Sequence, residues 1–354
     1  MKIVVIDALP IALLVLFVFG MKPVVPLASF NSNYNSIITG KNLRGLLAIT
    51  VIFHHLAQRT TGGLLFHQFT RVGFLAVAMF FFFSGYGLQK SYIVSREYRK
   101  HFLFHRIPPV LFPYVIVTAL FWIMYAIGGR FLSVKEIILA IINGSPIVSH
   151  SWYIINILIF YIVFWLLMNL FGSNYNGMII GACVWYVLYA AFCIKMGYGS
   201  WWYNASQLLI VGMFWATYEG KIEYFAKKHY KVLAPLVFGT FFVLFLFRGK
   251  LANDIGIKGL SLILTMICAV LFALSVLLFT MKFEIGNPAL AFLGKNSLEI
   301  YLVQGLFMTG LRNNTIYIQN EALWSLLTVF GSVALGTVLN YLLGFPLKKH
   351  KKRT

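Results

Sequence analysis

Charged residues are scarce in this chain, and acidic ones are the scarcest. Asp, Glu, Lys and Arg make up 11% of the 354 residues, with 9 acidic against 29 basic side chains, while apolar and aromatic residues make up 60%. Soluble domains carry about 25% charged residues. Because so few charges cannot cover a soluble surface, and because runs long enough to cross a hydrocarbon core of about 30 Å recur, the sequence predicts a polytopic helical membrane protein.

Cysteine is scarce as well. The three cysteines, Cys183, Cys193 and Cys268, lie inside apolar runs and lack the spacing of metal ligands. We therefore predict no disulfide framework and no metal centre, and expect small buried packing residues. The motifs G-x-S-x-G, H-E-x-x-H and G-x-x-x-x-G-K-[ST] are also absent. Any catalysis must then use intramembrane residues rather than one of these soluble motifs.

The net charge of +20 does not indicate a nucleic-acid partner, because the basic residues form short clusters between apolar runs. Such clusters follow the positive-inside bias of membrane proteins. The bias places the C-terminal tail LKKHKKRT in the cytoplasm, and counting back through the helices places the loops 94–107 and 219–230 there too. The loop with Arg248, Lys250 and Lys258 is an exception, since it is basic but falls on the opposite side.

The apolar runs predict an all-α polytopic membrane bundle of about ten core transmembrane helices plus one N-terminal helix. We expect helices near residues 3–20, 42–58, 70–92, 108–127, 152–171, 177–194, 203–219, 231–247, 258–281, 289–311 and 322–345. The stretch 131–148 adds an amphipathic piece, VKEIILAII, expected at the membrane interface. The predicted divisions are an N-terminal transmembrane helix and cytoplasmic linker (1–40), a membrane domain (41–346) and a basic cytoplasmic tail (347–354).

The start of the chain has the apolar character of a secretory signal peptide. Asp7 and Pro10 interrupt its apolar region, however, and no small-x-small cleavage site follows. We therefore expect a retained transmembrane helix that places the N-terminus outside.

The run LRGLLAITVIFHHLAQ at 43–58 places Arg44 and His55 on one predicted helix. Eleven residues at 100° each give about 1100°, roughly 20° past three full turns, so the two side chains share a face about 16 Å apart along the axis. His54 points roughly 100° away, toward a different face. We expect Arg44 at the cytoplasmic mouth of the helix and His55 near the middle of the membrane.

This same-face pair has two interpretations. An ionisable side chain inside a membrane is costly and usually marks a pathway or a reaction centre, and imidazole suits proton transfer near neutral pH. Alternatively, His55 is hydrogen-bonded across a helix interface and Arg44 is an interfacial anchor.

Four further stretches accompany the pair: FFFSGYGL at 81–88, RIPPVLFPY at 106–114, SWYI at 151–154 and LGKNSLEIYLVQ at 293–304. These stretches, together with an arginine followed by ten residues and a histidine, resemble the integral-membrane acyltransferase-3 family. The resemblance is in their order and spacing, and it extends over roughly residues 40–345. The resemblance implies a bacterial O-acyltransferase that modifies cell-surface polysaccharides or related acceptors.

The sequence departs from the family pattern at two positions. Leu103 stands where the family often has a second arginine, and Gln304 stands where the family often has a histidine. If that histidine takes part in the chemistry of relatives, this protein lacks it, or His54 or another residue substitutes.

The resemblance further implies acyl-CoA, most simply acetyl-CoA, as the donor. Guanidinium and ammonium groups suit the phosphates of CoA, because arginine binds two oxygens at once. The predicted phosphate-binding residues are Lys41, Arg44, Arg99, Lys100 and Arg106. The positive-inside bias alone would also place basic residues there.

The predicted catalytic residues are His55 and Arg44. His55 would serve as general base on an acceptor hydroxyl or as transient acyl carrier, and Arg44 would place the donor. The acceptor would be a glycan or a lipid-linked sugar. The enzyme would be a multi-pass protein of the bacterial plasma membrane, with a cytoplasmic C-terminus.

A wider set of residues is expected to line the substrate path. These are Ser84, Tyr86, Trp152, Tyr153, Ser297, Glu299, Tyr301 and Gln304. Each has a structural alternative: the glycines beside Ser84 suit close helix packing, Trp152 and Tyr153 suit an aromatic belt, and Glu299 suits a place near the interface. As a site residue, Glu299 would partner a buried arginine or orient an imidazole.

Two rival functions remain open. A transporter or flippase would use His55 and Glu299 as a proton relay, and would carry inverted repeats and matching broken helices, which the sequence does not display. The second rival function is a catalytically inactive scaffold in a glycan-synthesis complex.

Overall fold

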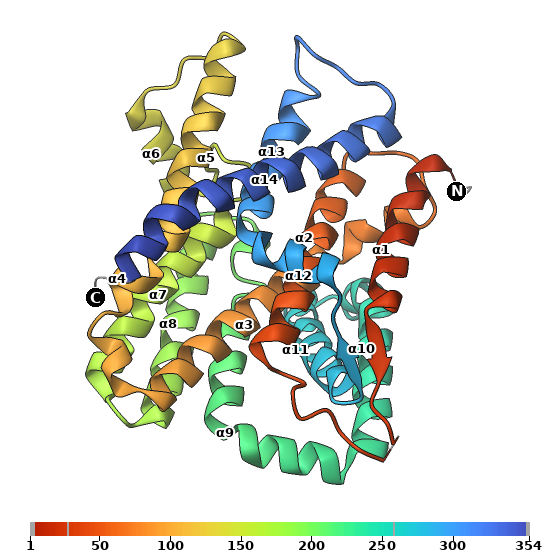
Figure 1. The fold of residues 1–354 in the computed structure, drawn as a ribbon, viewed down its shortest axis with the longest axis vertical. Helices are drawn as coiled ribbons and strands as arrows, with labels where there is room; N and C mark the ends of the chain where they lie inside the picture. Colours follow the sequence, from red (N-terminus) through yellow and green to blue (C-terminus); the bar gives the residue numbers. More distant parts are fainter. Residues whose placement is uncertain (1–3, 27, 258, 352–354) are drawn as a thin grey trace.

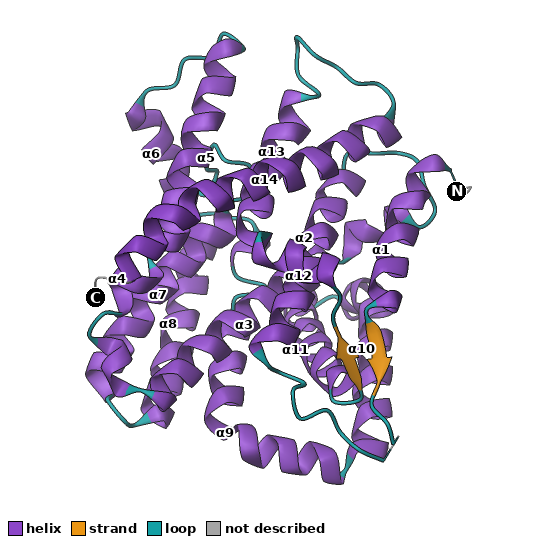
Figure 2. Cartoon of the chain, viewed as in Figure 1, coloured by secondary structure: helices purple, strands orange, loops and turns teal. Residues whose placement is uncertain are grey.

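The computed structural model describes residues 4–26, 28–257 and 259–351 and is built almost entirely of α-helices (Figures 1 and 2). The longer helices are α1 (Ala8–Phe19), α2 (Ile37–Ala57), α3 (Gly73–Val94), α5 (Pro108–Ile127), α7 (Trp152–Phe171), α8 (Tyr175–Lys195), α9 (Leu208–Lys228), α10 (Tyr230–Ile255), α11 (Leu260–Thr280), α13 (Ser297–Gly310) and α14 (Glu321–Lys351). The shorter ones are α4 (Phe102–Arg106), α6 (Val134–Ile142) and α12 (Pro288–Lys295). Two short strands, β1 (Met21–Pro23) and β2 (Phe283–Ile285), pair antiparallel.

Six of the described helices, α5, α7, α8, α10, α11 and α14 up to Gly344, are long and apolar enough to cross a membrane. This confirms the predicted all-α polytopic class. The central helices α2 and α3 are mixed in character because they carry polar side chains into the interior of the bundle. The core between the helices is aromatic, with Phe81, Phe82, Phe160 and Phe164 fully buried.

Two predicted helices differ from the structure. The expected helix at 289–311 is broken into α12 and α13 at Asn296, which leaves helical geometry (φ −104°, ψ 8°) and donates its side-chain amide to the Phe292 carbonyl at 2.8 Å. The expected helix at 203–219 begins later and ends at Lys228, with a break at Tyr218 (φ −112°, ψ 17°). Beyond that break the second half of α9 runs across the lower edge of the molecule in Figure 1.

The prediction of three buried cysteines was wrong at one position. Cys193 and Cys268 are buried, whereas Cys183 is exposed on α8. Two thirds of the most apolar window of α8 lies on the outer surface of the bundle, since 33% of that window is buried. An apolar run in a membrane helix therefore does not by itself identify a buried packing residue.

Glycines let two helix pairs approach closely. A Cβ on Gly85 of α3 would lie 1.9 Å from the Leu209 carbonyl oxygen of α9, and one on Gly212 of α9 would lie 2.3 Å from the Phe82 carbonyl oxygen. A Cβ on Gly294 of α12 would lie 1.8 Å from the Lys41 carbonyl oxygen of α2. These contacts require the absence of a side chain. They fix α9 against the middle of α3, and α12 against the first half of α2.

Asp7, which interrupts the first apolar run, has a structural role. Its carboxylate accepts the backbone N–H groups of Leu64, Leu65 and Phe66 at 2.8–3.0 Å, and that of Val4 at 3.0 Å. The carboxylate thus ties the start of α1 to the loop after α2, because each of these N–H groups would otherwise lack a partner.

Candidate functional site

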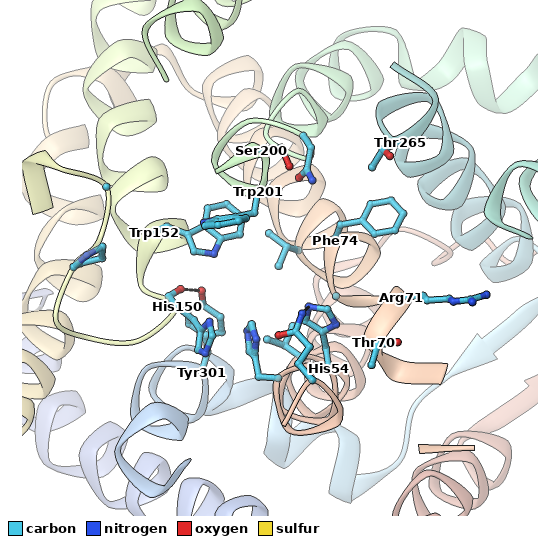
Figure 3. A pocket seen from close by; sticks show the side chains of 18 of the residues that line it. His54, Thr70, Arg71, Phe74, His150, Trp152, Ser200, Trp201, Thr265 and Tyr301 are labelled. Atoms are coloured by element: carbon cyan, nitrogen blue, oxygen red, sulfur yellow. Dashed lines mark hydrogen bonds between the residues drawn. The ribbon is translucent and has the colours of Figure 1, made fainter. Parts of the chain in front are cut away.

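Two adjoining cavities lie at the centre of the bundle. The larger, about 610 Å³, is lined by His54, His55, His150, Trp152 and Tyr301 among others (Figure 3). The smaller, about 200 Å³, is lined by residues from α2, α3, α5, α7, α12 and α13, including Arg44, Ser84, Tyr153, Ser297 and Tyr301. Val77 and Tyr301 line both cavities and so form part of the wall between them.

Helix α2 supplies the two residues of the predicted pair to different cavities. Arg44 lines the smaller one, and His55 lines the larger one. His55 lies in the last turn of α2. Because α2 begins at Ile37, Arg44 is already two turns inside the helix.

A second imidazole stacks on His55. The rings of His55 and His150 lie 3.5 Å apart between centroids, at an interplanar angle of 19°. Nδ1 of His55 and Nε2 of His150 are buried and have no hydrogen-bond partner among the described residues. Buried ring nitrogens are normally hydrogen-bonded. An orphaned nitrogen on each of two stacked rings therefore marks a site for a polar ligand or water.

The backbone of His150 is held in an uncommon conformation. His150 is the non-glycine residue with positive φ (67°) in the described part of the chain, a geometry that costs about 1–3 kcal/mol and is found often at functional sites. The hydroxyl of Tyr301 donates a hydrogen bond to its carbonyl oxygen (Figure 3). Helix α13 thereby fixes the loop that presents His150 to His55.

The His150 imidazole is neutral. Burial, together with the nearby positive charge of Arg59 and of His54, lowers the pKa of His150 to about 3. Removing the imidazolium from water disfavours its charge, and neighbouring positive charge disfavours it further. A neutral ring at this place allows proton exchange at His55 without two stacked cations.

His54 lines the larger cavity as well, although its helical angle predicted a different face from His55. Its Nδ1 lies 2.9 Å from the Phe69 carbonyl oxygen, and its Nε2 lies 3.2 Å from the Gln58 side-chain nitrogen. The carbonyl can only accept, so Nδ1 donates and Nε2 accepts from Gln58. Both nitrogens of His54 are engaged, in contrast to His55. The cavity is wide enough to reach two neighbouring positions of one helix.

Arg44 lies among hydroxyl groups rather than carboxylates. The lining of its cavity contains no Asp or Glu among the described residues, and its electrostatic partners are Tyr153 and Tyr161 of α7. Tyr153 also packs edge-on against Tyr301, with ring centroids 5.7 Å apart. A guanidinium held this way keeps its donors available for an anionic ligand.

The other predicted site residues divide into two groups. Ser84, Tyr153 and Ser297 line the smaller cavity, Trp152 lines the larger, and Tyr301 lines both. Residues that line neither cavity are Lys41, Tyr86, Arg99, Lys100, Arg106, Glu299 and Gln304.

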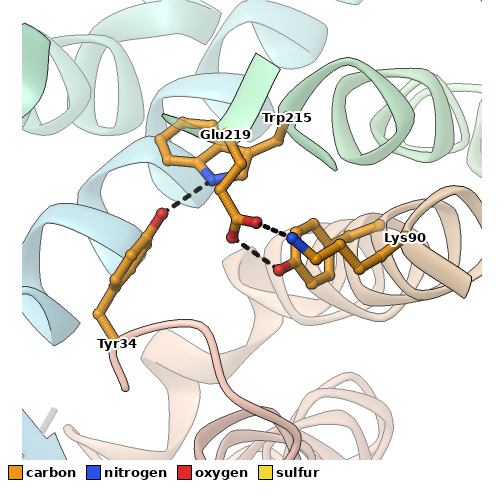
Figure 4. Close-up of polar contacts among 5 residues, drawn as sticks. Tyr34, Lys90, Trp215 and Glu219 are labelled. Atoms are coloured by element: carbon orange, nitrogen blue, oxygen red, sulfur yellow. Dashed lines mark hydrogen bonds and ion pairs between the residues drawn. The ribbon is translucent and has the colours of Figure 1, made fainter. Parts of the chain in front are cut away.

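Three of the substrate-lining predictions therefore need correction. Glu299 is buried in the first turn of α13, and Gln304 is buried with its amide donated to the Tyr301 carbonyl at 2.9 Å. Tyr86 donates to Glu219 of α9 at 2.7 Å, in a polar cluster that also holds Lys90 (Figure 4). The sequence pattern placed these residues on the right helices, but on faces that do not line the cavities.

Apart from Arg44, the predicted phosphate-binding residues lie outside the cavities. Lys100 pairs with Glu97 at 2.5 Å on the surface. Arg106 donates through Nε to the Tyr98 hydroxyl at 2.5 Å, and its guanidinium lies over the Tyr98 ring. These residues are placed to contact a large ligand only where it extends beyond the smaller cavity.

His150 is the residue that sequence reasoning missed. It lies directly before SWYI, a stretch already noted, but nothing in its spacing connects it to His55, ninety-five positions earlier. The loop conformation that joins the two rings has no signature in helical periodicity.

No group of three or more His, Cys, Asp or Glu side chains in the described residues is arranged to hold a metal ion. The fold and its interior polar cavities thus define a polytopic membrane protein with a site inside the bundle.

The family of the chain follows from comparison with known proteins. A family model described as an acyltransferase domain matches residues 41–341. The chain therefore belongs to the acyltransferase-3 family, as its motifs predicted, and is a multi-pass membrane acyltransferase. No curated protein and no solved structure matches it.

Proposed function

We propose that this protein transfers an acyl group, most simply acetyl, from cytoplasmic acyl-CoA to a hydroxyl of a cell-surface or lipid-linked glycan in the bacterial plasma membrane. The observation that carries the proposal is the pair of cavities meeting at Val77 and Tyr301, with an arginine in one and a histidine in the other. Donor and acceptor can then approach His55 from opposite sides.

The expected sidedness of the basic loops supports a donor role for one cavity and an acceptor role for the other. Arg44 lies in the N-terminal half of α2, close to Lys41. The positive-inside bias places this end of the helix at the cytoplasmic side. The larger cavity is lined by residues from the opposite loops, including Pro146 and Trp201. The donor would therefore enter by the smaller cavity, and the acceptor by the larger.

The volume of the smaller cavity suits a thin arm rather than a nucleotide. About 200 Å³ is below the 300–1,000 Å³ of sites that enclose a drug-sized ligand. Arg44 would hold a polar group of the pantetheine arm or a phosphate at the mouth. The remaining phosphates would lie against the surface residues Lys41, Arg99, Lys100 and Arg106.

In the reaction, His55 takes the proton of the acceptor hydroxyl as its oxygen attacks the thioester carbon. A carbon–oxygen bond forms, the carbon–sulfur bond breaks, and the proton passes from His55 to the departing thiolate. His150 stays neutral and holds the His55 ring by stacking. In the alternative, the acyl group first forms a bond with a His55 nitrogen and the acceptor removes it in a second step.

The test uses purified protein with labelled acetyl-CoA and a bacterial envelope extract as acceptor mixture. We expect His55→Ala to bind acetyl-CoA normally but to transfer label roughly 10²–10⁴-fold more slowly, the usual contribution of a general acid–base group. The matched control is His67→Ala, because His67 is exposed and lines neither cavity. A protein without affinity for acetyl-CoA that drives proton-dependent solute flux would contradict the proposal and support a transporter.

The rival proton relay has little geometric support. Glu299 lines neither cavity. A proton passing between Glu299 and His55 would have to cross packed side chains.

A further inference from the structure

The larger cavity carries two arginines that the acyl-transfer chemistry does not use. Arg71 ends the 3-10 turn at Phe66–Arg71, and Arg248 belongs to α10; both line the cavity. The lining contains no Asp or Glu, and neither arginine forms an ion pair with any described residue. The two guanidinium groups repel one another electrostatically. Arg71 is exposed and Arg248 is partly buried, and two like charges facing one cavity create a positive potential that attracts an anion.

Arg248 also explains an anomaly in the sequence. The sequence placed it in the basic loop that broke the positive-inside pattern, but α10 continues to Ile255 and includes both Arg248 and Lys250. Lys258 lies outside the described residues. Topology gives no reason for an arginine at this end of α10. Its position on the wall of the cavity gives a reason, because an arginine on the side that the positive-inside bias disfavours is expected to bind a ligand.

The guanidinium of Arg248 is held in a fixed orientation. It lies over the rings of Phe74 (4.8 Å to the centroid) and Phe245 (5.3 Å), and donates one hydrogen bond to the Phe245 carbonyl at 2.7 Å. Arginine has five N–H donors. The fixed orientation lowers the entropic cost of binding, and the unused donors match the paired oxygens of a phosphate or carboxylate.

The cavity is elongated, with different chemistry at its two ends. Figure 3 shows His150 and Tyr301 on one side and Arg71 and Thr265 on the other. Trp201 also lines it, and its side chain is 54% exposed. An aromatic surface and hydroxyl groups between a histidine end and an arginine end suit a sugar ring with a distant charged group.

We propose that the larger cavity binds an acidic acceptor glycan, whose phosphate or carboxylate group is held by Arg71 and Arg248 while its hydroxyl reaches His55. The proposal rests on the proposed acyltransferase function and narrows its acceptor class from any glycan to an anionic one.

Binding measurements test this without requiring turnover. Full-length protein in phosphatidylcholine nanodiscs is titrated with three oligomers of equal length: poly(glycerol phosphate), galacturonate and neutral galactose. We expect at least one anionic oligomer to bind about tenfold or more tightly than the neutral one. Arg248→Gln and Arg71→Gln should each reduce that preference about tenfold. Arg130→Gln, a matched surface arginine outside the cavity, should leave it unchanged.

Other outcomes overturn the proposal. Equal binding of charged and neutral oligomers would do so, as would equal losses in Arg130→Gln and Arg248→Gln. Anion binding that disappears when phosphatidylglycerol is added to the disc would assign the arginines to a lipid headgroup instead. Unchanged acetyl-CoA affinity shows that each variant is folded.

The same titrations separate this proposal from the acyltransferase function. Lost anion preference with intact acetyl transfer refutes only the acidic acceptor. Intact anion preference in a protein without acetyl transfer refutes only the transferase chemistry.

Discussion

The two cavities are built from different parts of the fold. The smaller is lined entirely by helical residues, from Arg44 on α2 to Tyr301 on α13. The larger takes much of its lining from loops and short turns, including Arg71, His150 and Trp201. A rigid helical wall suits one invariant guest such as a thioester arm, whereas loops can differ between proteins that act on different acceptors. The contrast suggests that donor specificity is fixed by the fold and acceptor specificity by the loops.

Arg44→Ala is expected to give the largest difference between ligand binding in the two cavities. We expect the affinity for acetyl-CoA to fall about 10- to 100-fold, because a hydrogen bond to a charged group contributes about 1.5–3 kcal/mol. Binding of the oligomer probes in the larger cavity should not change. Isothermal titration with each ligand measures both.

Arg44→Lys provides the control, since it keeps the charge but loses the paired donors. An equal fall in donor and oligomer affinity in Arg44→Ala would show that the two cavities act as one.

A second test concerns His150, at the histidine end of the larger cavity. His150→Asn keeps a residue that tolerates positive φ but removes the stacked ring. We expect transfer to slow about tenfold with little change in either affinity. His150→Phe restores the stack and should recover part of the rate.

The pH dependence distinguishes a positioning role from proton transfer at His150. Its pKa of about 3 lies below the working range, so the ring stays neutral from pH 5 to pH 9. Loss of His150 should therefore lower the height of the pH–rate profile without moving its limbs. A displaced limb would mean that His150 itself titrates during turnover.

The same contrast explains what the sequence could and could not predict. The family motifs drew attention to Arg44, Ser84, Tyr153, Ser297 and Tyr301, which line the smaller cavity. Helical periodicity relates residues on one element only, so it could not bring together His150 on a loop, Arg71 on a 3-10 turn and Arg248 on α10.

The helix ends show the same limit. The predicted bounds missed the break at Asn296, which depends on a side-chain hydrogen bond rather than on apolar pattern. The polytopic fold itself was predictable, because apolar run length is set by the membrane.

A substitution at the α3–α9 contact is expected to have a smaller effect on ligand affinity, and to affect both cavities. Helix α3 lines the larger cavity through Phe74 and the smaller through Ser84. Gly85→Ala would place a methyl group against the Leu209 carbonyl and force the helices apart, a change that costs about 1–3 kcal/mol. We expect a lower thermal midpoint and parallel losses in donor and oligomer affinity.

Gly87→Ala is the matched control, since nothing lies within 4 Å of its added Cβ. A destabilisation equal to that of Gly85→Ala would indicate that helix flexibility, rather than close packing, requires the glycines.

The smallest effects are expected from the surface residues of the donor side. Lys100 pairs with exposed Glu97, and Arg106 is engaged by Tyr98, so neither offers a free, desolvated charge. Exposed charges contribute about 0–1 kcal/mol and are screened by salt. Lys100→Gln and Arg106→Gln should therefore weaken acetyl-CoA binding by about fivefold at most, and less at high ionic strength, whereas the effect of Arg44→Ala should persist in salt. A salt-resistant loss in Arg106→Gln as large as that of Arg44→Ala would extend the donor site from the helical cavity to the α4–α5 junction.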